Sequence, residues 1–394
     1  MKLALYNPHI DDFLACPPHF PILRRRALKK YGFLIEEKLD KSDTRIVFYD
    51  SSLSAFIPVS LFGRLPYFIR KIVAEIEMFF WIRINKVDRK TISVTSDPKD
   101  LKGAVLFAMS YKCALGDIDR RMSVFATTQF NIFHLSHYFL NTRKKSENLS
   151  KIPNLFLAGD SDITDNKYFQ KHFQWYKNRF LVLPFAVQDR FVQKEPIGKK
   201  INKCVATGTF HRLDQEATAQ LKEFTEFYAI DTYHPVRKAI YNSRNKYKEH
   251  FDCKVSLFRD YEAKKNLGGL IKRFQVSQKG YFKNDIVEVY NSYSYAVVGE
   301  EITGFPGIGS FEAMACGCVL IAVPEYYIGL GLKSGEHFIC YNGDISLIPG
   351  ILEKTDDITR RYISENAMRY VNEKFRSKGV CFNWFHVVSG LSNQ

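Results

Sequence analysis

The stretch at residues 295–324, YAVVGEEITGFPGIGSFEAMACGCVLIAVP, constrains the fold more than any other part of the chain. Its apolar runs at residues 295–298 and 319–323 predict two short buried strands. Between them lie a loop with four glycines and a run of helix formers that Ser310 opens and Gly317 closes. A strand, a glycine loop, a short helix and a second strand are the repeating unit of a parallel α/β sheet.

The glycine loop ahead of this helix, which we predict at residues 311–316, suits an anion. A helix N-terminus presents backbone N–H groups that no carbonyl satisfies, and glycines let a phosphate approach them closely. We therefore predict that Gly307, Gly309 and Ser310 contact the phosphate of a bound ligand. Glu312, one turn into the helix, is placed to accept hydrogen bonds from both hydroxyls of a ribose. The alternative is a tight strand-to-helix turn with a solvated glutamate.

The same stretch closely resembles the donor motif of GT-B glycosyltransferases, Glu-x-Phe-Gly-Leu-x-x-x-Glu-Ala-Met-Ala-x-Gly-x-Pro-Val-Ile-Ala. Residues 312–322, EAMACGCVLIA, match its second half nearly residue for residue, and Pro-Gly-Ile at residues 306–308 replaces Phe-Gly-Leu. The resemblance implies that Glu312 holds the donor ribose. Gly304 replaces the first glutamate of the motif, which contacts the donor hexose in the family, so the resemblance leaves the donor open.

The resemblance also implies the architecture, an α/β fold of the GT-B type with two Rossmann-like domains of parallel sheets that face each other across a cleft. The length of 394 residues is enough for two domains. We place an acceptor-binding domain at residues 1–195 and a nucleotide-sugar-binding domain at residues 200–375. Residues 376–394 are expected to return to the N-terminal domain, as the last helix does in GT-B enzymes.

The first domain shows strand patterns and one candidate catalytic residue. Apolar runs predict strands at residues 3–6, 45–49, 103–110, 122–128, 154–158 and 180–187. We place His134 and His137 on a helix and interpret them as buried or capping residues, because no further metal ligand is evident. Asp160 directly follows a predicted strand, where active sites gather in open α/β sheets, and is a candidate base or sugar ligand. A helix-capping or turn aspartate is the alternative.

The second domain opens with a predicted strand at residues 204–207 that ends at a glycine turn. Gly208, His211 and Arg212 lie at this turn. In GT-B proteins the second domain also opens with a strand and a glycine turn. By that resemblance, His211 and Arg212 are candidates to face the donor phosphates.

A dense polar cluster at residues 231–238 precedes a further predicted helix, which Pro235 starts. His234 or Arg237 would neutralise the leaving phosphate. Asp231 would attack or stabilise the anomeric carbon. The alternative is a capped helix with a solvated basic face.

The donor is predicted from one short match. The pair His234-Pro235 resembles the His-Pro pair with which sialyl- and Kdo transferases help to hold CMP. We therefore expect CMP-Kdo, as in bacterial β-Kdo transferases of surface polysaccharide (lipopolysaccharide or capsule) assembly, with a UDP- or GDP-hexose as the alternative. The Glu-Ala-Met-Ala match implies a retaining enzyme, and with Gly304 in the motif we expect a covalent route through Asp231. No metal or other cofactor is expected, because GT-B enzymes use helix N-termini and cations to take up phosphate charge.

Composition and short motifs limit which binding partners and which cellular compartment we expect. The formal charge of +15 suggests an acidic partner, but the basic residues are scattered and no RRM, KH or zinc signature occurs, so we expect no nucleic acid. The eight cysteines form no CxxC pair, no signal peptide is evident and no apolar stretch is long enough to span a bilayer. A cytoplasmic protein is therefore expected. A catalytically inactive GT-B relative that serves as a scaffold is the non-enzymatic alternative.

Residues 51–84 are the most apolar part of the chain and mix aromatic with basic side chains. Such a mixture suits a helix that lies in a membrane interface, and peripheral contact with an anionic membrane would suit an enzyme whose acceptor is a lipid-linked glycan. The alternative is one or two core helices packed under a loop, and we favour the core.

Overall fold

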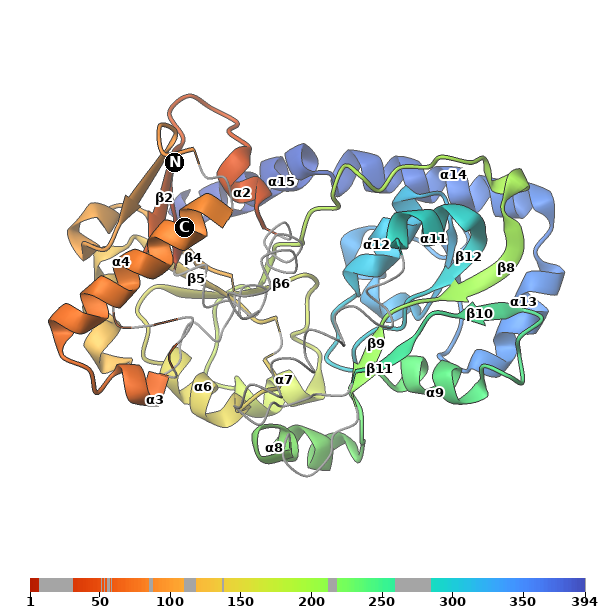
Figure 1. The fold of residues 1–394 in the computed structure, drawn as a ribbon, viewed down its shortest axis with the longest axis horizontal. Coiled ribbons are helices and arrows are strands. Elements are labelled where there is room, and N and C mark those ends of the chain that lie inside the picture. The colour runs from red at the N-terminus through yellow and green to blue at the C-terminus, as the bar shows by residue number, and fades with distance from the viewer. Residues whose placement is uncertain are drawn as a thin grey trace. The chain divides into compact units, whose positions relative to one another are not determined.

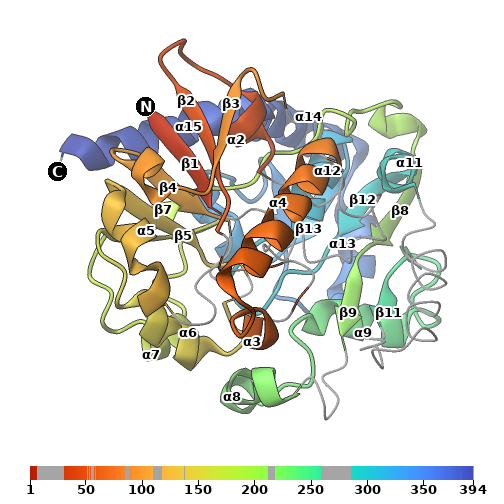
Figure 2. The same ribbon diagram turned by 60° about the vertical axis from the view of Figure 1, so that its left-hand side comes forward.

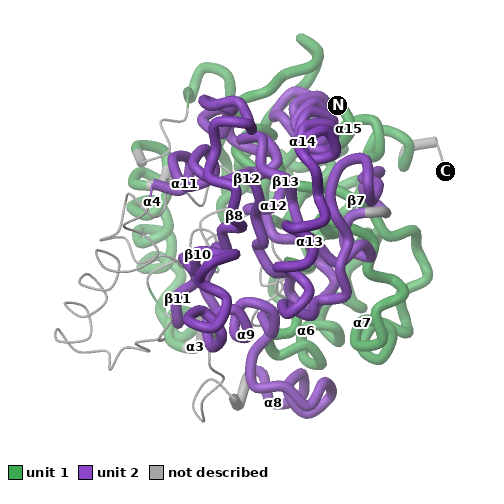
Figure 3. Tube along the Cα trace, turned by 90° about the vertical axis from the view of Figure 1, so that its right-hand side faces the viewer, with its two compact units in different colours: residues 1–186, 380–394 green, residues 187–379 purple. Residues whose placement is uncertain are grey.

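The computed structural model describes residues 1–6, 31–50, 52, 54, 57, 59–84, 88–109, 118–136, 138–211, 218–258 and 285–393. The chain divides into two compact units (Figure 3). Unit 1 comprises Met1–Ala186 and Val380–Gln394, and unit 2 comprises Val187–Gly379. The sequence analysis placed these boundaries at residues 195–200 and 375–376. Each unit contains its own parallel sheet (Figure 1).

Unit 1 is built around a seven-stranded parallel sheet in the order β3-β2-β1-β4-β5-β6-β7 (Figure 2). Its strands are β1 (Lys2–Tyr6), β2 (Thr44–Phe48), β3 (Ile92–Thr95), β4 (Val105–Ala108), β5 (Phe130–His134), β6 (Leu155–Gly159) and β7 (Leu181–Val182). The central strands are buried on both faces, which explains their continuous apolar sequences. The strand order reverses between β1 and β4, because the chain runs from β1 outward to β3 before it returns to β4.

Two secondary-structure predictions for unit 1 are wrong, one at residues 122–128 and one at His134. The helices of unit 1 include α2 (Phe33–Glu36), α3 (Val59–Phe62), α4 (Tyr67–Ile84), α5 (Met122–Thr127), α6 (Thr142–Leu149) and α7 (Lys167–His172). Helix α5 occupies the segment predicted as a strand at residues 122–128, since so short an apolar run does not distinguish a helix from a strand. The prediction that His134 lies on a helix is also wrong, because it ends β5. His137 lies outside the described residues.

The C-terminal helix α15 (Ser377–Ser389) packs on unit 1 through aromatic side chains. Trp384 is fully buried, and its ring meets Phe107 of β4 edge to face with the centroids 4.9 Å apart. The guanidinium carbon of Arg45 lies 4.4 Å from the centroid of the Phe385 ring. Residues 380–394 therefore belong to the core of unit 1 although they follow unit 2 in the sequence.

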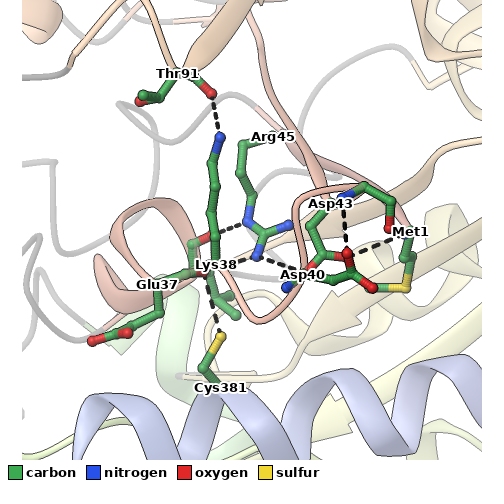
Figure 4. Close-up of polar contacts among 10 residues, drawn as sticks. Met1, Glu37, Lys38, Asp40, Asp43, Arg45, Thr91 and Cys381 are labelled. Carbon is green, nitrogen blue, oxygen red and sulfur yellow. Dashed lines mark hydrogen bonds and ion pairs between the residues drawn. The ribbon is translucent and has the colours of Figure 1, made fainter.

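A polar cluster at the start of β2 holds Arg45 beneath this helix (Figure 4). Arg45 is only 2% exposed, and it donates from Nε to the Leu34 carbonyl at 2.7 Å and from Nη2 to the Glu37 carbonyl at 2.8 Å. The Asp43 carboxylate lies 3.7 Å from Nη2 and accepts a hydrogen bond from the N-terminal ammonium at 3.2 Å. Burial lowers the pKa of Arg45, and the charge of Asp43 opposes that shift. Fixed acceptors thus satisfy Nε and Nη2 of this buried cation, whereas its Nη1 has no hydrogen-bond partner among the described residues.

We expect the Arg45→Met substitution to destabilise unit 1 by about 2–4 kcal/mol, because two buried carbonyls and Asp43 lose a charged donor. Urea unfolding of the full chain, followed by circular dichroism, measures the change. Arg89→Met is the matched control at an exposed position, and it should stay within about 0.5 kcal/mol of the wild type. Equal unfolding midpoints for the two variants would show that the cluster does not stabilise unit 1.

Unit 2 contains a five-stranded parallel sheet in the order β10-β8-β12-β13-β14. Its strands are β8 (Ile201–Ala206), β10 (Phe251–Cys253), β12 (Tyr293–Val297), β13 (Val319–Ala322) and β14 (Phe338–Cys340), while β9 (Thr209–His211) and β11 (Ser256–Phe258) form a separate pair. The strands predicted at residues 295–298 and 319–323 correspond to β12 and β13. The strand order reverses between β8 and β12, because β8 lies between β10 and β12.

The helices of unit 2 include α8 (Thr218–Tyr228), α9 (Pro235–Ser243), α11 (Ile286–Ser292), α12 (Ile308–Ala315), α13 (Ile348–Lys354) and α14 (Asp357–Lys374). Helix α12 begins earlier than predicted, with Gly307 rather than Ser310 at its N-cap. Gly317 follows the C-cap with a φ of +79°, a conformation that favours glycine. Cys204, Cys316 and Cys318 are buried, as their apolar surroundings in the sequence predict.

Candidate functional site

The carboxyl edge of the unit 2 sheet, between β8 and β12, brings together several residues that the sequence singles out. In an open parallel sheet, ligands bind at the edge where the strand order reverses. The turn at residues 207–209 follows β8 here, and the loop at residues 298–307 follows β12. The Arg237 side chain at the start of α9 contacts both loops, and α12 begins directly after the second loop. We therefore take this edge as the candidate site.

Arg237, in the first turn of α9, joins the two loops. Its Nε donates to the Val298 carbonyl at 2.7 Å and its Nη1 to the Thr209 carbonyl at 2.9 Å. A Cβ on Gly208 would lie 2.7 Å from Nε of Arg237, and one on Gly299 would lie 2.9 Å from its Cγ. Both glycines also have φ values in the left-handed region, +115° and +69°. The close approach of Arg237 therefore requires glycine at both positions.

Helix α12 starts beside this cation. Its N-cap, Gly307, provides no side-chain cap, and the first N–H groups of a helix have no intrahelical partner. A Cβ on Gly307 would lie 3.5 Å from Nη2 of Arg237, so the guanidinium and the helix start are neighbours. Together they suit a phosphate group. Glycine at position 309 is also needed for packing, because a Cβ there would lie 2.9 Å from the Tyr290 hydroxyl, and the phosphate contact predicted for Gly309 stays a prediction.

Ser310 belongs to a buried polar network rather than to the helix start. Its Oγ lies 2.8 Å from the Tyr327 hydroxyl, which donates to Oε1 of Glu300 at 2.8 Å. Its N–H donates to the Gly307 carbonyl at 3.0 Å, so the phosphate contact predicted for Ser310 has no support in this geometry. Burial raises the pKa of Glu300, although the hydrogen bond from Tyr327 and the charge of Arg237 lower it. Oε2 of Glu300 is buried without a hydrogen-bond partner among the described residues.

Glu312 presents a half-buried carboxylate on α12. Within the part of the chain that the structure describes, no hydrogen bond or ion pair reaches this carboxylate. Burial raises the pKa of Glu312 to about 7, and the charge of Arg190 opposes the shift. A carboxylate that is removed from water and lacks a protein donor is ready to accept hydrogen bonds from the hydroxyls of a ligand.

His234 lies at the same edge, as the N-cap of α9. Its side chain is buried, and its Nε2 lies 3.6 Å from Oε1 of Glu301 in the loop after β12. The Ile302 N–H donates to the Tyr233 carbonyl at 3.2 Å, which joins the same two segments through their backbones. The structure thus places His234 and Arg237, which the sequence predicts together, against one loop.

Asp231 has a different environment. Its side chain is 63% exposed and forms an ion pair with Lys238 of α9. An exposed ion pair leaves a carboxylate hydrated, whereas an attacking carboxylate must be held and partly dehydrated at the anomeric carbon. The role of nucleophile predicted for Asp231 therefore has no support in its position.

Asp160 lies in unit 1, where it directly follows β6 and is buried. The Tyr31 hydroxyl donates to Oδ1 of Asp160 at 3.2 Å, and Nε2 of His134 lies 2.9 Å from that hydroxyl and 3.5 Å from Oδ1. The Ser136 N–H donates to Nδ1 of His134 at 3.2 Å, which assigns the ring proton to Nε2 in the neutral tautomer. Three side chains that can accept or donate a proton are thus in contact at the carboxyl ends of β5 and β6.

The phosphate contacts predicted for His211 and Arg212 cannot be followed to their side chains. The structure describes His211 as the last residue of β9, and Arg212 lies outside the described residues. Sequence reasoning missed Tyr290 and Tyr327, which contact the predicted segments from distant positions in the chain. No local pattern marks them, because their partners are set by the packing of the sheet.

Known structures share the fold of this chain. No protein-family profile matches the sequence, and no curated protein sequence matches it either. Sucrose-phosphate synthase from Thermosynechococcus elongatus aligns with a TM-score of 0.51 over 100% of this chain and 99% of its own, at 11% identity. Anabaena HepE in complex with UDP-glucose aligns with a TM-score of 0.52 over 100% of both chains, at 13% identity. The complex of HepE with UDP and glucose gives 0.52 over 100% of both chains, at 12% identity.

These alignments, together with the two parallel sheets, confirm the predicted fold class. The chain has the GT-B fold, with a Rossmann-like sheet in each unit. At this level of identity the alignments establish the fold, and the chemistry must be argued from the site.

We expect the Gly208→Ala substitution to destabilise the protein by about 1–3 kcal/mol, because the added methyl would collide with Arg237 at a strained φ. Differential scanning calorimetry of the full chain measures the effect. Gly198→Ala is the matched control, since no atom lies within 4 Å of its added Cβ, and it should stay within about 0.5 kcal/mol of the wild type. A Gly208→Ala variant as stable as the control would contradict the proposed packing of Arg237.

Proposed function

We propose that this chain is a glycosyltransferase and that unit 2 binds its nucleotide-sugar donor. The observation that carries the proposal is the carboxylate of Glu312, half-buried in a GT-B fold and without a donor among the described residues. A carboxylate that burial desolvates without satisfying it is costly unless a ligand completes its hydrogen bonds. The two hydroxyls of a ribose can each donate to one oxygen of the Glu312 carboxylate. This is the role that the Glu-Ala-Met-Ala resemblance implies for Glu312.

The neighbouring groups suit the phosphates of such a donor. Arg237 brings a fixed cation beside Gly307, and α12 contributes the backbone N–H groups of its first two residues, Ile308 and Gly309. The leaving phosphate gains negative charge as the glycosidic bond breaks, and groups already in place stabilise that charge without reorganisation. His234, held beside Glu301, is a second candidate for this role.

The donor is proposed to be a UDP-hexose or CMP-Kdo. The UDP-hexose is favoured by the shared fold with HepE, whose solved structures contain UDP-glucose and UDP with glucose. CMP-Kdo is supported only by the pair His234-Pro235. The acceptor is proposed to be a glycan or lipid-linked glycan of a surface polysaccharide, bound by unit 1.

Unit 1 supplies a candidate group for the acceptor proton. An attacking hydroxyl must lose its proton, and a buried carboxylate in contact with a tyrosine and a neutral histidine is suited to hold it. We assign this role to Asp160, with Tyr31 and His134 as positioning residues. Retention of anomeric configuration stays a prediction. The covalent route through Asp231 is not part of the proposal, because that residue is exposed and ion-paired.

Donor binding should depend on pH through Glu312. Its folded pKa of about 7 lies above the unfolded value of about 4.3, so it contributes stability below pH 4.3 that is lost as the pH rises through 7. Ribose hydroxyls donate to the ionised form, which is about a tenth populated at pH 6. We therefore expect the affinity for the nucleotide sugar, measured by isothermal titration calorimetry, to rise about tenfold from pH 6 to pH 8.

Two variants test whether Glu312 causes this dependence. Glu312→Gln should weaken binding by about tenfold or more at pH 8 and remove the dependence, since an amide does not titrate and has one accepting oxygen in place of two. Glu365→Gln, at an exposed position on α14, is the matched control and should bind like the wild type. Wild-type affinity in Glu312→Gln would remove Glu312 from the donor site.

A nucleotide panel tests the proposed function itself. Thermal shifts with CMP, UDP, GDP and ADP, and with UDP-glucose and CMP-Kdo, identify the base, because a ligand that binds the native state raises the melting temperature. Release of free nucleotide from the preferred donor in the absence of acceptor then separates an enzyme from an inactive scaffold. No shift with any of these compounds would overturn the proposal.

A further inference from the structure

Helix α4 turns large apolar side chains away from unit 1. Phe68, Ile72, Ile76 and Phe79 are 64%, 53%, 50% and 53% exposed. Their spacing of three and four residues places them along one side of the helix. We refer to these four residues as the α4 face, and Figure 2 shows the helix from its outer side.

The opposite side of α4 packs on unit 1 through Ala74, Glu77 and Ile82, and Ile82 contacts the cluster of Val47 and Ile92. Ala74 and Glu77 are both buried, and Glu77 accepts hydrogen bonds from the Tyr49 hydroxyl at 2.9 Å and from the Ser54 hydroxyl. A surface helix ordinarily buries its apolar stripe and exposes its polar one. Helix α4 instead leaves the four apolar residues of the α4 face exposed, so the interpretation of this segment as a core helix is wrong for that face.

Exposed apolar surface is concentrated here. Of the sixteen exposed large apolar side chains in the described residues, seven lie at residues 61–80, one on α3 and six on α4. The other nine are distributed over the rest of the described chain. A contiguous exposed apolar patch marks an interaction site, whereas scattered apolar side chains need no explanation.

Basic side chains accompany the patch. Arg64, Lys71 and Arg83 are exposed, and the guanidinium carbon of Arg83 lies 5.3 Å from the centroid of the Phe79 ring. Arg70 similarly lies 5.8 Å from the ring of Tyr67. Cations beside aromatic rings suit the boundary between lipid headgroups and acyl chains, where the ring is buried and the charge meets phosphate.

We propose that the α4 face docks on an anionic lipid bilayer, with the helix in the plane of the membrane. The formal charge of +15 and the cations around the patch complement such a surface. None of the described helices is both long and apolar enough to cross a bilayer. A second copy of the chain is a poorer occupant, because a two-fold contact through this face would bring Lys71 and Arg83 of both copies together. The proposal rests on this surface and not on the donor site.

Vesicle sedimentation with the full chain tests the proposal. We expect the protein to sediment with vesicles of mixed phosphatidylglycerol and phosphatidylcholine, and at least about tenfold less with phosphatidylcholine alone. Added salt should weaken the binding, because part of it is electrostatic. The double substitution Phe68→Ser and Ile72→Ser should reduce binding to the anionic vesicles by at least about tenfold, since two exposed apolar anchors are lost.

The chain offers a matched control for this variant. Ile358 and Tyr362 of α14 have the same spacing and are 81% and 54% exposed, so Ile358→Ser with Tyr362→Ser should bind like the wild type. If the α4 variant loses its melting transition, Lys71→Glu with Arg83→Glu replaces it, and this variant should also lose binding.

Three outcomes would overturn the proposal. The first is a wild type that sediments with neither kind of vesicle. The second is an α4 variant that melts like the wild type and binds as well as the control does. The third is a wild-type dimer, seen by sedimentation velocity, that only the α4 variants convert to monomers, because the occupant of the α4 face would then be a second copy.

Discussion

One arginine side chain fixes the carboxyl edge of the unit 2 sheet. Arg237 donates to the loops after β8 and β12, and the two glycines that face it leave no room for any other residue type. Because the same guanidinium lies beside Gly307, it also sets a positive charge at the start of α12. A cation placed to stabilise the loops is therefore already in position for an anionic ligand. The stability of this edge and its chemistry depend on the same contact.

The two units carry different chemistry at corresponding edges of their sheets. In unit 2 the half-buried carboxylate of Glu312 stands alone, without a donor among the described residues, which suits the hydroxyls of a bound ribose. In unit 1 the carboxylate of Asp160 is already in contact with Tyr31 and His134, which suits proton transfer more than ligand recognition. Burial alone does not distinguish these two proposed roles, because the difference lies in the hydrogen-bond partners of each carboxylate.

The sequence predicted the parts of the fold that depend on local pattern. Strands β12 and β13, the glycine turn after β8 and the position of Glu312 follow from apolar runs, glycines and a motif. Tertiary packing decides contacts that no local pattern shows: Ser310 bonds to Tyr327, and the α4 face is exposed while Glu77 on the other side of the helix accepts from Tyr49. Short apolar runs such as that of α5 carry too few residues for their period to select a helix.

The most direct test of the account is hydrogen–deuterium exchange of the full chain with and without its preferred nucleotide sugar. We expect slower exchange at the turn at residues 207–209 and at residues 298–312, where ligand phosphates and ribose would cover backbone N–H groups. Saturating ligand that leaves both segments unchanged, while it slows exchange elsewhere, would contradict the central claim.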